Sequence, residues 1–122
     1  TGITSQIVGL SLSTTGNPEH KKAVLQKTFA SKIDNKRILN RAGLRLMDNE
    51  RYNDAIALLL LNVELYSDDG NLWDSLGEAY FVSGQYGQAK QAFTQAIERK
   101  PADNCFWCDN SATRLQQISE AE

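Results

Sequence analysis

The chain has 122 residues, of which 41% are apolar, and this is enough to bury a hydrophobic core. Its net charge of −2 is unevenly divided, because residues 1–47 carry eight Lys or Arg against two acidic residues, whereas residues 48–122 carry five against thirteen. The acidic part would repel phosphates and the basic part lacks interleaved aromatics, so we expect no nucleic-acid partner. No apolar run reaches membrane-spanning length, so we expect no membrane insertion.

The first 16 residues allow more than one interpretation. Val8, Leu10 and Leu12 alternate with small or polar residues, which is typical of a strand. A lone strand, however, would need a pairing partner that the helical patterns elsewhere in the chain do not offer. A helix, a strand and irregular structure therefore stay open for this segment.

Residues 17–35 carry the signals of a helix start. Asn17 suits the N-cap, Pro18 the first helical position and Glu19 the first turn. The apolar stripe of this helix is then Leu25, Phe29 and Ile33. The only histidine, His20, falls in the same helix, where we expect it to face solvent.

Residues 36–69 and 70–103 show the same pattern at an offset of 34 residues. The later segment has two helical faces, separated by Ser83 and Gly84 and closed by Pro101. Its patterned positions are Trp73, Leu76, Gly77, Tyr80, Tyr86, Ala89, Phe93 and Ala96. The earlier segment matches with Leu39, Ala42, Gly43, Leu46, Tyr52, Ala55 and Leu59, and departs at Asn62 and Ser67. A further shift aligns Gly9 with Gly43 and Gly77, which favours the helical interpretation of the first residues.

This pattern closely resembles the tetratricopeptide repeat family. The resemblance implies an all-α fold, an α-α superhelix of helical hairpins with a terminal capping helix. We expect one domain over residues 1–122, with a degenerate repeat or flanking segment at 1–35, repeats at 36–69 and 70–103, and the capping helix at 104–122. In that cap, Ala112, Leu115 and Ile118 form a narrow apolar stripe.

Cys105 and Cys108 form a CxxC motif in the segment before the cap. Two cysteines supply half of a structural zinc site, and no βαβ pattern supports a thioredoxin-like site. Three interpretations stay open: reduced cysteines under the cap, a local disulfide, and a metal or redox function. Glycine-rich phosphate loops and nucleophile motifs are absent, so we expect neither an enzyme nor a cofactor. The adjacent Asp68 and Asp69 are better suited to capping the next helix.

The resemblance implies a binding groove lined by the first helix of each repeat. The residues that it places there are Arg37, Asn40, Leu44 and Met47 from one repeat, and Asn71, Asp74, Glu78 and Phe81 from the next. The leading hypothesis is therefore a non-catalytic protein-interaction module with a peptide or a partner domain as ligand.

Two alternatives remain. The runs at 61–66 and 73–80 look like the repeat tail behind bacterial serine-hydrolase domains, which would make the chain an accessory domain of a hydrolase. Self-association through the oppositely charged ends is the other. The sequence leaves the cellular compartment undefined.

Overall fold

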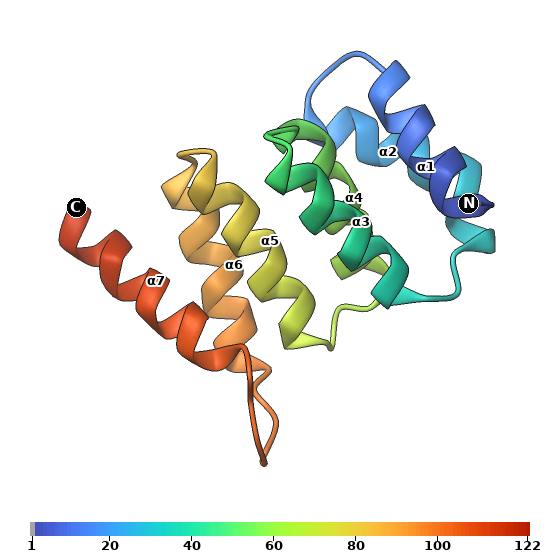
Figure 1. The fold of residues 1–122 in the computed structure, drawn as a ribbon. Helices are drawn as coiled ribbons and strands as arrows, with labels where there is room; N and C mark the ends of the chain where they lie inside the picture. Colours follow the sequence, from blue (N-terminus) through green and yellow to red (C-terminus); the bar gives the residue numbers. More distant parts are fainter. Residues whose placement is uncertain (1) are drawn as a thin grey trace. The chain divides into compact units, whose positions relative to one another are not determined.

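The computed structural model describes residues 2–122, and Thr1 lies outside this range. Seven α-helices and one short 3-10 helix form the fold, and residues 2–122 contain no strand (Figure 1). The elements are α1 (Ile3–Ser13), α2 (Pro18–Phe29), η1 (Ala30–Lys32), α3 (Lys36–Asp48), α4 (Tyr52–Leu65), α5 (Gly70–Val82), α6 (Tyr86–Glu98) and α7 (Cys108–Ala121). The prediction of an all-α fold built from helical hairpins is confirmed. The chain divides between Leu65 and Tyr66 into two compact units, each described by itself below, and the single-domain layout stays a prediction.

The first unit packs α1, α2, α3 and α4 around one hydrophobic core. Its fully or almost fully buried side chains include Ile7, Leu25, Phe29, Leu39, Leu58 and Leu61. Because α1 is a helix that directs Ile7 into this core, the strand alternative for the first residues is wrong. Asn17 caps α2 as predicted, since the backbone N–H of His20 donates to its Oδ1 at 2.9 Å, and the side chain of His20 is exposed.

A buried ion pair also joins α1 and α2 to α4. The ammonium group of Lys21 donates to Asp54 Oδ1 at 2.8 Å and to the carbonyl oxygen of Ser11 at 2.7 Å. The hydroxyl of Ser11 donates to the same Asp54 oxygen at 2.6 Å. At the positions that correspond to Lys21, the later repeats have Ala55 and Ala89. The first hairpin therefore uses a polar contact where the others use small apolar residues.

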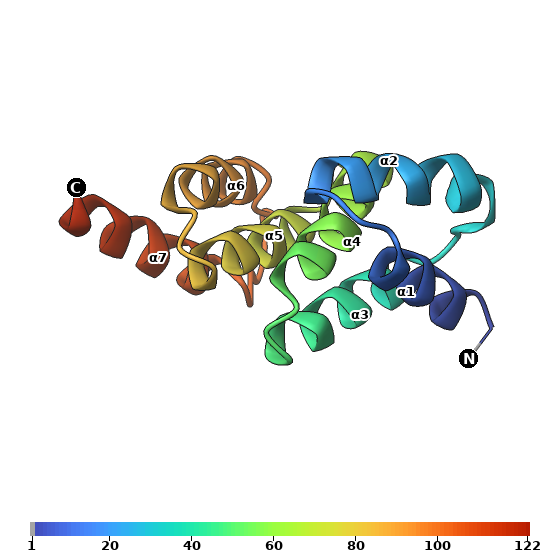
Figure 2. The ribbon, with the colours of Figure 1, turned by 90° about the horizontal axis from the view of Figure 1, so that it is seen from above.

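The second unit consists of α5, α6 and α7. Figures 1 and 2 both show α5 and α6 side by side and joined by a tight turn. Its core contains Ala89, Phe93 and Ile118, with Tyr80, Phe81 and Leu115 packed against them. The capping helix is present as α7, but its apolar stripe is narrower than predicted because Ala112 is exposed.

The two later hairpins have equivalent turns. Gly84 ends α5 in the left-handed conformation at φ 83°, and Glu50 takes the corresponding place after α3 at φ 61°. In both turns a backbone N–H reaches back to the preceding helix, from Gln85 to Tyr80 at 2.8 Å and from Arg51 to Leu46 at 2.8 Å. These bonds complete the helix ends. The 34-residue period is therefore visible in the backbone as well as in the sequence.

Two of the aligned glycines mark close helix contacts. A Cβ atom added at Gly77 would lie 2.7 Å from the ring of Phe93, and one added at Gly43 would lie 2.7 Å from Leu59 Cδ2. A Cβ atom added at Gly9 would meet no other described atom within 4 Å. The alignment of Gly9 thus finds a helix, but not the close contact that requires glycine in the two later hairpins.

Candidate functional site

The α3 half of the predicted site forms an open face. Asn35 starts α3 by accepting a hydrogen bond from the backbone N–H of Arg37 at 3.0 Å. Leu39, Gly43 and Leu46 point into the core of the first unit, so the opposite side of the helix remains polar. A pocket of about 450 Å³ lies on that side, lined by Arg37, Asn40, Arg41, Leu44, Arg45 and Asp48.

Three of the four residues predicted on α3 line this pocket. Arg37 is exposed, and Asn40 and Leu44 are half-buried. Met47, by contrast, packs against the core of the first unit, because its position on α3 is turned toward the buried side.

Three pocket residues were missing from the predicted set: Arg41, Arg45 and Asp48. The sequence signal that identifies two of them is a stripe of like charge, since Arg37, Arg41 and Arg45 follow one another at intervals of four residues. Such residues share one side of a helix. We call these three arginines the arginine ladder.

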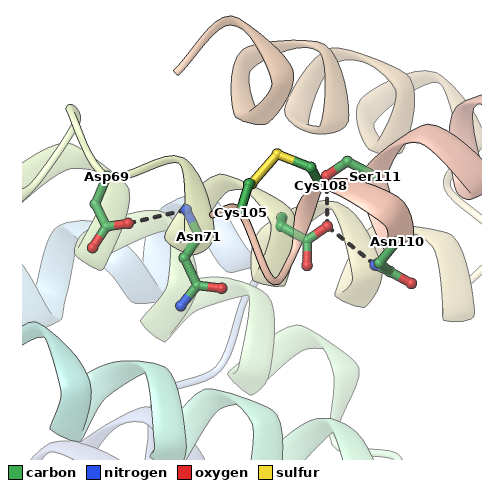
Figure 3. Close-up of a disulfide and its surroundings, with 7 residues drawn as sticks. Asp69, Asn71, Cys105, Cys108, Asn110 and Ser111 are labelled. Atoms are coloured by element: carbon green, nitrogen blue, oxygen red, sulfur yellow. Dashed lines mark hydrogen bonds between the residues drawn. A yellow bond between two sulfur atoms is a disulfide. The ribbon is translucent and has the colours of Figure 1, made fainter. Parts of the chain in front are cut away.

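The α5 half of the predicted site is largely occupied by α7. The carboxylate of Asp74 accepts hydrogen bonds from Ser111 Oγ at 2.6 Å and from Asn110 Nδ2 at 3.1 Å (Figure 3). Glu78 pairs with Arg114 through two hydrogen bonds, at 3.0 and 2.7 Å. The repeat pattern does not predict these partners, because Asn110, Ser111 and Arg114 lie where that pattern breaks down.

The guanidinium group of Arg114 also covers an aromatic ring. Its central carbon lies 4.2 Å from the centre of the Phe81 ring, a cation–π distance. Phe81 also contacts Tyr86, with 5.3 Å between ring centres. Of the four residues predicted on α5, Asn71 has no hydrogen bond to α7 within residues 2–122, and its side chain is half-buried. Its backbone N–H donates to Asp69 Oδ1 at 3.0 Å, which confirms Asp69 as the cap of α5.

The environment of Asp74 changes its titration. Burial raises the pKa of the Asp74 carboxyl above its ordinary value, and the hydrogen bonds from Ser111 and Asn110 offset part of this effect. The pKa of Arg114 is raised, first of all by its hydrogen bonds to Glu78. These polar groups lie in a contact between two helices of the same unit. They therefore have a structural explanation before any functional one.

The sequence left three interpretations of the two cysteines open, and the structure shows the local disulfide. The bond joins Cys105, three residues before α7, to Cys108, the first residue of α7 (Figure 3). Trp107, between them, is buried and packs closely over Gly70, where an added Cβ atom would lie 2.3 Å from the indole ring. Residues 2–122 hold no group of three or more side chains suited to a metal ion.

Comparison with known families identifies one segment of the chain. Residues 70–103, which comprise α5, α6 and their turn, match the tetratricopeptide repeat family. A search of curated proteins gave no match to the chain. Among the described helices, none is long and apolar enough to cross a membrane. The predicted family resemblance is therefore confirmed over 70–103, and a repeat of this kind indicates a protein-interaction module.

Proposed function

We propose that this chain is a non-catalytic protein-interaction module that binds a segment of a partner protein on the exposed face of α3. One observation supports α3 over α5 as the binding helix. The polar side chains predicted on α5 are bonded to α7, whereas those on α3 line a pocket. A partner could reach the α3 face without first displacing part of the chain.

The composition of the pocket also suits a peptide. Leu44 supplies the apolar floor of the pocket, and Asn40, Asp48 and the arginine ladder supply polar side chains. Polar groups placed around an apolar floor fix the orientation of a ligand, and here five of the six lining residues are polar or charged. Nucleophilic catalysis would need a nucleophile and a base within hydrogen-bonding distance of each other. Of the six residues that line the pocket, only Asp48 is of a type that could take either role, so the pocket holds no such pair, which supports binding without chemistry.

The test is selection of ligands from a displayed library of random peptides, with the immobilised chain as target. Peptides that are enriched are labelled and titrated by fluorescence anisotropy against the wild type and Leu44→Asp. We expect Leu44→Asp to abolish binding, because it places a charge on the apolar floor. Leu12→Asp is the matched control, since Leu12 is an exposed leucine on α1 of the same unit. Equal affinity of Leu44→Asp and wild type, or failure to enrich any peptide, would contradict the proposal.

A further inference from the structure

The disulfide lies at the surface of the second unit and closes a very short loop. Cys105 and Cys108 are half-buried, and Asn104 and Phe106 beside them are exposed. The stabilisation that a disulfide gives to a fold grows with the length of the loop that it closes, and these cysteines are only three positions apart. Exposed disulfides are also the ones that are reduced most readily. The bond is therefore better suited to opening and closing than to holding the fold together.

The two sulfur atoms differ in their electrostatic environment. Cys108 is the first residue of α7, a helix of 14 residues, and the free backbone N–H groups at a helix start stabilise a thiolate. Cys105 precedes the helix and lacks this support. The carboxylate of Asp109 opposes the effect, but this residue is exposed and solvent screens its charge. Cys108 is therefore the better leaving group when the disulfide is attacked.

The exchange reaction needs a dithiol as reductant. A thiolate of the dithiol attacks Cys105 Sγ, the S–S bond breaks, and its electron pair leaves on Cys108 Sγ. The second thiolate of the dithiol then attacks the dithiol's own sulfur in the mixed disulfide and releases the Cys105 thiolate. The reductant becomes a disulfide, and its two electrons and two protons end on the thiols of Cys105 and Cys108.

Trp107 connects the disulfide to the packing of α7 against α5. Its indole ring is buried over Gly70, the first residue of α5, where an added Cβ atom would collide with it. Because Trp107 lies inside the closed loop, the disulfide restricts the backbone on both sides of this residue. Reduction removes the restriction. The contact between the two helices then depends on an indole ring that is less well held and on the hydrogen bonds from α7 to Asp74 and Glu78.

We propose that Cys105 and Cys108 form a reversible dithiol–disulfide site, that a protein dithiol reduces it, and that reduction loosens α7 from α5. In the oxidised state, α7 bonds to Asp74 and covers the ring of Phe81. In the reduced state these side chains are exposed for a larger share of the time. This inference goes beyond the proposed function, because neither cysteine lines the pocket on α3.

The first measurement is the rate at which dithiothreitol reduces the bond. The wild-type chain is treated with and without urea, samples are quenched and alkylated, and the intact mass gives the number of free thiols. We expect the native chain to be reduced within about tenfold of the rate of the unfolded chain, because the bond is at the surface. A larger difference would show that the bond opens only when the unit unfolds, and would overturn the inference. Oxidised glutathione, added after the dithiothreitol is removed, should restore the disulfide.

Hydrogen exchange followed by mass spectrometry tests the link to α7. We expect reduction to speed amide exchange in α7 by at least about threefold, because a helix that leaves its packing partner exposes its amides. Peptides from α1 to α4, in the first unit, are the internal control and should not change. Equal exchange of α7 in the oxidised and reduced chains would overturn the inference.

Two variants of the loop separate the disulfide from other effects of the reagent. The double variant Cys105→Ser with Cys108→Ser should exchange like the reduced wild type and should not respond to dithiothreitol. Phe106→Ala is the matched control, because it changes an exposed side chain of the same loop and should keep the difference between the two states. A response of the double variant to dithiothreitol would overturn the inference.

Single-cysteine variants test which sulfur leaves. The thiol of Cys108 in Cys105→Ser should react with iodoacetamide at least about threefold faster than the thiol of Cys105 in Cys108→Ser, because the helix start favours its thiolate. Equal or reversed rates would overturn the assignment of Cys108 as the leaving group.

Discussion

The close approach at Gly77 gives a sharp test of the α5–α6 packing. In Gly77→Ala the new Cβ atom would lie 2.7 and 2.8 Å from Phe93 Cδ1 and Cε1, so the ring would have to retreat by about 0.7 Å or more to reach ordinary contact. The Phe93 side chain is fully buried and has little room to move. Overpacking of this kind costs about 1 to 3 kcal/mol. Replacing a helical glycine by alanine stabilises the helix by about 1 kcal/mol. We therefore expect the free energy of unfolding to fall by about 1 kcal/mol in total.

Urea titration followed by tryptophan fluorescence suits this measurement, because Trp73 and Trp107 both lie in the second unit. The matched control is Gly87→Ala, also in the second unit, where an added Cβ atom would meet no described atom within 4 Å. It should be neutral or should stabilise by up to about 1 kcal/mol. If Gly77→Ala were as stable as this control, the close contact and the register of the hairpin would be refuted.

Three further results are expected. Phe93→Ala should lower the free energy of unfolding by about 3 to 5 kcal/mol in the same titration. Phe106 is 85% exposed, so Phe106→Ala should change it by less than about 0.5 kcal/mol. Similar effects of both substitutions would contradict the placement of Phe93 in the core. Cys105 and Cys108 form a disulfide, so a thiol-alkylating reagent added to the denatured chain without reductant should leave its intact mass unchanged. An increase in mass from alkylation of either cysteine would contradict the disulfide. Burial raises the pKa of Asp74, so its contribution to stability is present below the ordinary pKa of about 4 and is lost as pH rises through the raised value. Asp74→Asn should therefore flatten the fall in stability across that window, and an unchanged pH profile would contradict this account.

The sequence predicted the hairpins well because their signals are local. The glycine at 84, the cap at Asp69 and the spacing of apolar residues each act within one or two turns of helix. The first residues were ambiguous for the same reason. Their alternating pattern suits a strand locally, and the packing of Ile7 against residues distant in sequence makes them helical instead.

The candidate site was harder to predict, because it depends on contacts between segments far apart in the chain. Asp74 and Glu78 lie at the groove positions that the family resemblance predicts, but their hydrogen-bond partners come from α7, more than thirty residues later. No periodicity connects those partners to α5. The arginine ladder, in contrast, was visible in the sequence as a regular stripe. The comparison with known groove positions selected Arg37 from it and passed over Arg41 and Arg45.

The corresponding helices α3 and α5 thus differ in the hydrogen-bond partners that their polar side chains require. The carboxylates of Asp74 and Glu78 on α5 are acceptors, and α7 supplies donors for both within the same unit. The α3 helix carries mainly donors in the arginine ladder, and the described chain supplies no acceptors for them. Because like charges four residues apart destabilise a helix, neutralising the arginine ladder would stabilise α3.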